Sequence, residues 1–198
     1  SNARHWFSHY YMAQGDLPKA TTEMQAALKL EPLSPSINIG IGWCYYYGQQ
    51  FDKAIEQYRS VVDADPGFPL AHQTLAMALV QSKMYEDAIS EYQKAVTLSG
   101  GSPTTIAGLA TAYAGAGKIN EARAEMTKLE EMSRHRYIPA LYFGMIHNSL
   151  GEPSETFRFA WKALGERSDY FMYLRLEPLV GKTAGNPEFI RLLGMIHR

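Results

Sequence analysis

Residues 35–68 read PSINIGIGWCYYYGQQFDKAIEQYRSVVDADPGF, and residues 69–102 continue with PLAHQTLAMALVQSKMYEDAISEYQKAVTLSGGS. The two segments have the same length and carry small residues at the same places, so that Gly42 corresponds to Ala76. The spacing of 34 residues continues in both directions along the chain. A fixed period of this length indicates one supersecondary unit that is copied and stacked.

Two series of small residues follow this period. The first is Ser8, Gly42, Ala76, Ala110 and Gly144, and the second is Ala20, Ala54, Ala88 and Ala122, ending at Thr156. Small side chains at both places allow two antiparallel helices to approach closely. The pattern therefore predicts a helical hairpin as the repeated unit.

Prolines and turn residues mark where the helices begin and end. Ser34-Pro35, Phe68-Pro69 and Ser102-Pro103 each offer a proline at the first helical position, and serine can cap the free N–H groups there. In the fifth unit the proline is shifted to Pro139. Glycine ends the first helix in three units, at Gly15, Gly117 and Gly151, and Gln49 and Lys83 hold the matching places.

The period predicts five hairpins, at residues 4–34, 35–68, 69–102, 103–136 and 137–170. Ser1-Asn2-Ala3 is typical of the remnant of a cleaved expression tag, so we expect native residues from Arg4 onward, as part of a parent chain that could be longer. Residues 171–198 are expected to form a capping segment. Within it, Asn186-Pro187 is typical of a helix start, and Phe189, Leu192, Leu193 and Ile196 form an apolar stripe at helical spacing.

The pattern resembles the tetratricopeptide repeat over residues 4–170. The resemblance implies an all-α fold, a right-handed superhelical solenoid of about five helical hairpins with a C-terminal capping helix. One departure is the tryptophan often found early in the first helix of this family. The chain has Arg4, Asn38, His72, Ile106 and Ala140 in that place. Thr156 and His147 make the last repeat degenerate, as an end cap requires.

The composition narrows the classes of partner. The chain has 198 residues, a formal net charge of −1 and a single cysteine, Cys44. Near-neutral charge gives no reason to expect direct nucleic-acid binding, and no apolar run reaches the roughly 20 residues that span a bilayer. We expect no membrane contact within this segment and a cytoplasmic location, although a parent chain could be anchored upstream.

The first helices of units two to five contain no Asp, Glu, Lys or Arg, whereas the second helices and turns carry nearly all the charge. In the family that this chain resembles, the first helices line the concave face, which should therefore be apolar or neutral. Helical spacing predicts the residues that face this groove: Ile39, Trp43, Tyr46, Tyr47, Gln73, Met77, Val80, Thr111, Leu141 and Met145.

An aromatic wall of this kind suits an apolar peptide or helix of a partner protein, although the same aromatics could instead pack on adjacent helices. Family members that grip a chaperone's C-terminal carboxylate use Lys, Arg and Asn on the first helices. This chain offers only His5, His9 and Asn38 there, so we do not expect a carboxylate clamp.

Two motifs suggest other chemistry but are incomplete. Gly181-Lys182-Thr183 resembles the end of a phosphate-binding loop, but Leu176 stands where the first glycine is required. His5 and His9 are spaced to share a helix face, without a third metal ligand nearby. We therefore expect no cofactor, no metal and no catalytic residues.

A narrower resemblance concerns the C-terminal repeat regions of bacterial signalling proteins, which are fused to winged-helix, Ser/Thr kinase or adenylate cyclase domains. It is carried by LEPLSP at residues 30–35, LSGGS at 98–102, YIP at 137–139 and NPEFIRLL at 186–193. The resemblance implies a non-catalytic, protein-binding regulatory module. The alternatives are a module for self-association and, less in keeping with the charge-free helices, an enzyme.

Overall fold

The structure, a computed structural model, describes residues 2–166 and 186–195, and it contains helices and short connections but no strand within them. Ten helices form five consecutive hairpins, and an eleventh helix follows. Their bounds are α1 Asn2–Ala13, α2 Leu17–Leu30, α3 Pro35–Tyr47, α4 Phe51–Ala64, α5 Pro69–Gln81, α6 Tyr85–Leu98, α7 Pro103–Gly115, α8 Ile119–Ser133, α9 Ala140–Ser149, α10 Pro153–Gly165 and α11 Pro187–Met195. The predicted all-helical repeat fold is confirmed.

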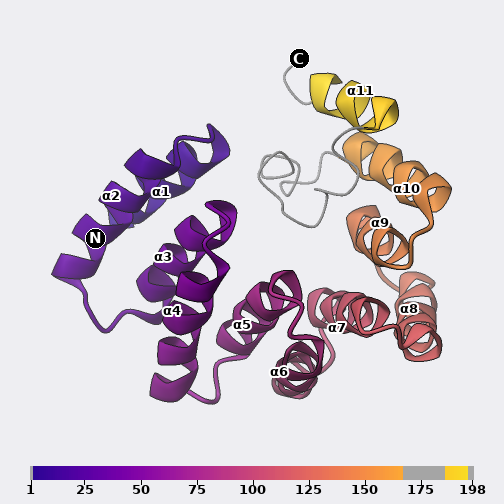
Figure 1. Cartoon of the computed structure of the whole chain (residues 1–198), viewed down its shortest axis with the longest axis horizontal. Helices are drawn as coiled ribbons and strands as arrows, with labels where there is room; N and C mark the ends of the chain where they lie inside the picture. Colours follow the sequence, from indigo (N-terminus) through magenta and orange to yellow (C-terminus); the bar gives the residue numbers. More distant parts are fainter. Residues whose placement is uncertain (1, 167–185, 196–198) are drawn as a thin grey trace.

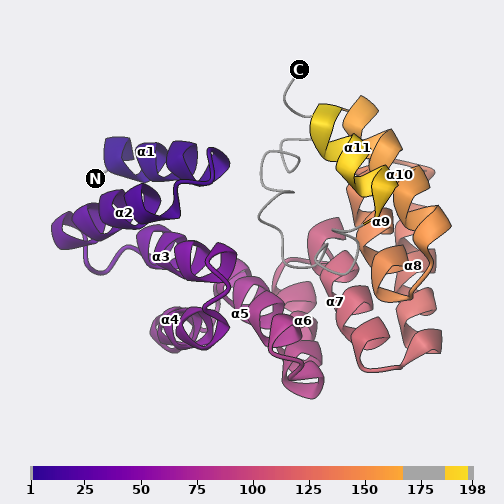
Figure 2. The ribbon, with the colours of Figure 1, turned by 45° about the horizontal axis from the view of Figure 1, so that its top comes forward.

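The hairpins stack in sequence order along an arc (Figure 1). The first helices α3, α5, α7 and α9 lie toward the inside of the arc, and the second helices α4, α6, α8 and α10 form its outer side. Figure 2 shows the same succession from another direction. Each inner helix contacts its own outer helix and the neighbouring hairpins, and the buried hydrophobic residues form three clusters that follow one another along the arc.

Every hairpin turn contains one residue with a positive φ angle. These residues are Gly15, Gln49, Lys83, Gly117 and Gly151, with φ between 57° and 77°. They are spaced by the repeat period. The turn therefore keeps one backbone conformation whether or not glycine occupies it, although the left-handed region is unfavourable for Gln49 and Lys83.

The predicted helix starts are confirmed at Pro35, Pro69 and Pro103. Ser102 caps α7, because its side chain accepts a hydrogen bond from the backbone N–H of Thr105. Ser34 does not cap α3 in this way. Its carbonyl oxygen instead accepts a hydrogen bond from Asn38 Nδ2 at 2.9 Å.

The small residues lie in the core, as predicted. Ser8, Ala76, Ala110 and the four alanines of the second series are all 0% exposed. Gly42 is buried against the ring of Tyr58 from α4. A methyl group at Gly42 would meet this ring, so only glycine permits the approach of α3 to α4 seen here.

A polar pair occupies the place of the missing tryptophan in three hairpins. The first helix of each hairpin contributes one member and the second helix the other. The pairs join Arg4 Nη1 to Glu23 Oε2 at 2.9 Å, Gln57 Nε2 to Asn38 Oδ1 at 2.9 Å, and His72 Nδ1 to Glu91 Oε2 at 2.6 Å. Each pair crosses from the inner to the outer helix, so hydrogen bonds replace the packing of a large aromatic side chain.

Helix α11 lies against α10 (Figure 2), as a capping helix would. Trp161 of α10 donates a hydrogen bond from Nε1 to Glu188 at 3.2 Å, and the Arg191 guanidinium lies 5.6 Å from the Trp161 ring centre. The predicted stripe side chains, including Ile196, and residues 171–185 of the predicted capping segment lie outside what the structure describes.

Candidate protein-binding face

Three sides of helix α3 are occupied by other helices. Gly42 faces Tyr58 of α4, and Cys44 lies beside Ser8 and Thr21 of the first hairpin. Tyr46 faces the third hairpin, where its hydroxyl lies 3.5 Å from Gln81 Nε2. The remaining side carries Trp43, which is half-buried and whose ring meets Tyr58 of α4 edge to face at 6.3 Å, so this side is only partly accessible.

The repeat period extends this side to all five inner helices. We call the resulting set the inner stripe. It consists of His5, His9, Ile39, Trp43, Gln73, Met77, Ala107, Thr111, Leu141 and Met145. Sequence reasoning identified seven of these residues, and subtracting one period from Ile39 and Trp43 would also have found His5 and His9.

The ten residues predicted to line the groove differ in exposure. Trp43, Gln73, Met77, Val80, Leu141 and Met145 are half-buried. Ile39, Tyr46 and Thr111 are at most 3% exposed, and Tyr47 is 9% exposed. The structure thus places Ile39 and Thr111 of the inner stripe, together with Tyr46, within the core, and the six half-buried side chains remain partly accessible.

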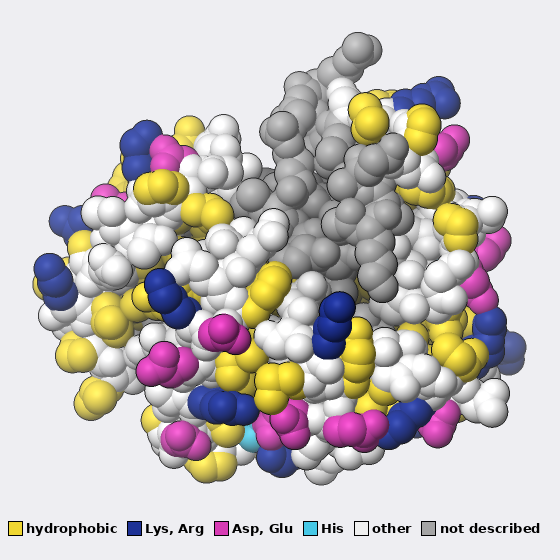
Figure 3. All heavy atoms as spheres, in the orientation of Figure 1, with side chains coloured by type: hydrophobic (Ala, Val, Ile, Leu, Met, Phe, Trp, Pro, Cys, Tyr) yellow, Lys and Arg dark blue, Asp and Glu magenta, His cyan; other side chains and the backbone are white. Residues whose placement is uncertain are grey.

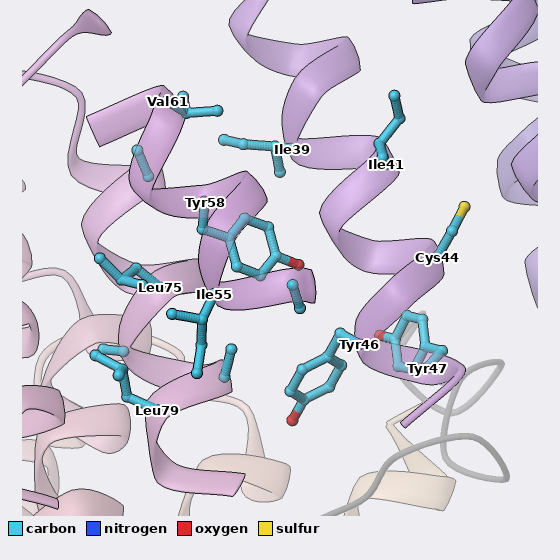
Figure 4. Packing of buried hydrophobic residues seen from close by; sticks show 14 of the residues in the cluster. Ile39, Ile41, Cys44, Tyr46, Tyr47, Ile55, Tyr58, Val61, Leu75 and Leu79 are labelled. Carbon is cyan, nitrogen blue, oxygen red and sulfur yellow. The ribbon is translucent and has the colours of Figure 1, made fainter. Parts of the chain in front are cut away.

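Trp43 is the centre of an aromatic cluster, and two of its neighbours, Tyr46 and Tyr47, are labelled in Figure 4. The Trp43 ring stacks on Tyr47 with 5.4 Å between ring centres and meets Tyr46 edge to face at 5.6 Å. Tyr46 in turn meets Phe51 at 5.8 Å. Edge-to-face and offset-stacked contacts of this kind hold each ring in one orientation, so Trp43 presents a fixed apolar surface.

The inner stripe carries little charge. Helices α3, α5, α7 and α9 contain no Asp, Glu, Lys or Arg, and charged side chains gather along the outer edge of the molecule in Figure 3. Burial lowers the pKa of His5 and of His9, and the nearby His5 lowers the pKa of His9 further. Both imidazoles are therefore biased toward the neutral form, and their Nε2 atoms lie 3.1 Å apart.

Other binding chemistries find little support in the described residues. Asn38 is engaged by the Pro32 and Ser34 carbonyls and by Gln57, so it does not reach a ligand in the way that a carboxylate clamp requires. Within residues 2–166 and 186–195, no cluster of three or more His, Cys, Asp or Glu could hold a metal ion. Gly181-Lys182-Thr183 lies outside these residues.

Known sequences place the chain in a family. Sequence models described as tetratricopeptide repeat match residues 7–69, 45–103 and 79–137. Together these matches cover more than half of the chain, and the chain belongs to the tetratricopeptide repeat family. Tetratricopeptide repeats generally mediate protein–protein interactions. No curated protein matches the sequence.

Solved structures show the same fold. A thermophilic tetratricopeptide repeat protein from Thermus thermophilus is 18% identical with a TM-score of 0.71, over 90% of this chain and 98% of its own. MamA from Desulfovibrio magneticus is 16% identical with a TM-score of 0.60, over 85% and 96%. A tetratricopeptide repeat protein from Parabacteroides merdae is 14% identical with a TM-score of 0.58, over 99% and 78%.

Each of the described helices is too short or too polar to cross a bilayer.

Proposed function

We propose that the inner stripe binds an apolar segment of a partner protein and that the chain is a non-catalytic interaction module. The observation that carries the proposal is the absence of Asp, Glu, Lys and Arg from four successive inner helices. A partner that docks on such a face buries no unpaired charge of this chain, which would otherwise cost several kcal/mol. An apolar segment is therefore the ligand that this face favours.

The side chains left accessible support the same partner chemistry. Trp43 provides a rigid aromatic anchor, and Met77, Leu141 and Met145 provide half-buried apolar contacts along the arc. Tryptophan is frequent among residues that dominate binding energy, and methionine adapts to irregular apolar surfaces. Gln73 adds an amide that can hydrogen-bond the backbone of the bound segment.

The narrower proposal concerns the biological setting. The resemblance to repeat regions of bacterial signalling proteins supports a regulatory role, in which partner binding controls a winged-helix, kinase or cyclase domain. Cytoplasmic location belongs to the same proposal. The reading frame upstream of Arg4 tests this part alone, because one of these three effector domains should be encoded there.

The binding proposal can be tested without knowing the natural partner. A displayed library of random peptides is selected on the wild-type chain, and the selected peptides are titrated against a Met77→Lys/Met145→Lys variant. We expect apolar peptides whose affinity for this variant falls at least tenfold. Met84→Lys is the matched control, because Met84 is exposed at the start of α6 and lies outside the inner stripe.

Two results would argue against the binding proposal. One is selection of charged peptides without an apolar core. The other is unchanged affinity of apolar peptides for the double lysine variant, provided that circular dichroism shows both variants to be as helical as the wild type.

A further inference from the structure

Two histidines of helix α1 face each other across one helical turn. His5 and His9 are four residues apart, and their Nε2 atoms lie 3.1 Å apart. Both side chains are half-buried. The two rings are therefore partly enclosed, and the atoms that meet are the ring nitrogens at their tips.

The repeat does not account for this pair. At the same two positions the later hairpins carry Ile39 and Trp43, Gln73 and Met77, Ala107 and Thr111, and Leu141 and Met145. None of these residues is a histidine. The packing of an inner helix therefore does not require two imidazoles here.

The spacing of the two nitrogens suits a shared metal ion. Imidazole binds transition metals through one ring nitrogen, at about 2.0–2.1 Å for Zn²⁺. A metal ion at that distance from both Nε2 atoms, which are 3.1 Å apart, would have an N–metal–N angle of about 100°. This angle lies between the roughly 90° of a square-planar centre and the roughly 109° of a tetrahedral one. The two nitrogens thus already have the separation that a shared ion needs.

The protons and charges around the pair also permit coordination. In the contact between two neutral rings, one Nε2 donates its proton to the other. Transfer of that proton to Nδ1 of the same ring turns both Nε2 lone pairs to the metal and releases no proton. The neighbouring Arg4 is paired with Glu23 at 2.9 Å, so its positive charge is compensated.

Access to the pair does not depend on what precedes helix α1. Gln73 and Met77 hold the two positions in the third hairpin, and Leu141 and Met145 hold them in the fifth. All four are half-buried, although another hairpin precedes each of these hairpins. A preceding hairpin therefore leaves this side of an inner helix partly accessible.

We propose that His5 and His9 bind a divalent transition-metal ion through their two Nε2 atoms, with Cu²⁺ bound most tightly. Among divalent first-row metals, Cu²⁺ is generally the one that a given nitrogen site prefers. The sequence argued against a metal because a third protein ligand is missing, and the described residues contain no group of three ligands. Water fills the remaining positions. This site does not depend on the function proposed for the inner stripe.

Titration with Cu²⁺ alone tests the proposal. In calorimetry, His5→Asn or His9→Asn should weaken Cu²⁺ binding about tenfold or more, because the second imidazole no longer binds intramolecularly. Pulsed EPR should detect two imidazoles on the ion in the wild type and one in each variant. His135→Asn is the matched control and should change neither result, because His135 is exposed on the connection between α8 and α9.

A double variant tests the spacing. His9→Asn/Tyr10→His keeps the number of histidines but places them five residues apart, on different sides of α1. Tyr10 is 58% exposed, so the change spares the core, which circular dichroism checks. We expect this chain to bind Cu²⁺ as weakly as His9→Asn does.

Three results would overturn the proposal. The first is wild-type affinity in the double variant, and the second is wild-type affinity in both single variants. The third is detection of fewer than two imidazoles on the ion in the wild type, which would mean that Cu²⁺ binds adventitiously to other groups.

Discussion

The ring of Tyr58 lies directly against the backbone of Gly42, and a Cβ atom on Gly42 would lie 2.1 Å from Tyr58 Cε1. Tyr58 is 0% exposed and belongs to the core between the second and third hairpins, so its ring has no free space to move into. This contact sets how closely α3 and α4 approach.

We predict that Gly42→Ala destabilises the chain by about 1–3 kcal/mol, because the overpacking of the core outweighs the better helix propensity of alanine. Chemical denaturation monitored by circular dichroism measures the change. Gly165→Ala is the control, because a Cβ at Gly165 meets no atom within 4 Å, and it should be neutral or slightly stabilising. Equal stability of the two variants would show that the contact at Gly42 is not restrictive.

The turns lead to a reciprocal prediction. Gln49 and Lys83 have φ angles of 57° and 59° at places where other hairpins have glycine. Replacing either residue by glycine should stabilise the chain by about 1 kcal/mol, since a left-handed conformation costs a non-glycine residue about that much. Gly117→Gln should cost a similar amount, as its Cβ would meet nothing within 4 Å and only the backbone would be strained. Thermal unfolding measures these changes, and the account would be refuted if the glycine variants lowered Tm and Gly117→Gln raised it.

The pair His72–Glu91 predicts that the stability of the fold depends on pH in the acid range. Burial raises the pKa of Glu91, but the hydrogen bonds donated by Lys94 and His72 outweigh it, and the pKa lies below its ordinary value of 4.5. A carboxyl group with a lowered pKa in the folded state stabilises the fold above its unfolded pKa, and this contribution is lost as pH falls through the folded pKa. Stability should therefore decline below pH 4.5.

The second hairpin supplies the matched variant. It holds the neutral pair Asn38–Gln57 in the same place, so a His72→Asn/Glu91→Gln chain keeps hydrogen-bonding groups without the titrating carboxyl. Below pH 4.5, the ordinary pKa of Glu91, the Tm of this variant should fall less steeply than that of the wild type. If the Tm values of the two proteins fell equally with pH, Glu91 would not contribute to the loss of stability in acid.

His5 and His9 affect stability over a separate pH range, below 6.5. Their pKa values are lowered from 6.5 by burial, so the folded state disfavours their charged forms. The stability that the two neutral imidazoles contribute is fully present above their unfolded pKa of 6.5. It is lost as pH falls from 6.5 through their lower pKa values in the folded state. The double variant His5→Gln/His9→Gln should lose less stability than the wild type over this range, measured by urea denaturation. An identical loss in both proteins would contradict the assigned burial.

The sequence alone predicts most of the fold because the period is visible in one dimension. Gly42, Ala76 and Ala110 recur every 34 residues, and this spacing predicts an equivalent helix around each of them. The pairs Asn38–Gln57 and His72–Glu91 could not be predicted in the same way. Their members lie 19 residues apart on different helices, and they meet only once the hairpin has closed.

The candidate site was less predictable than the fold. Helical spacing identifies the side of α3 that carries Trp43, but it does not say how deeply the next hairpin covers that side. Tyr46 illustrates the difference, since it meets Phe51 of α4 and reaches Gln81 of α5.

Site-specific cross-linking tests the central claim, binding of an apolar segment on the inner stripe, most directly. A photoreactive benzoylphenylalanine replaces Met77 in one chain and Met84 in another, and each is irradiated with the same selected apolar peptide. Mass spectrometry should find the peptide attached at position 77 and not at position 84. Attachment at position 84, or at neither position while the peptide still binds, would contradict the account.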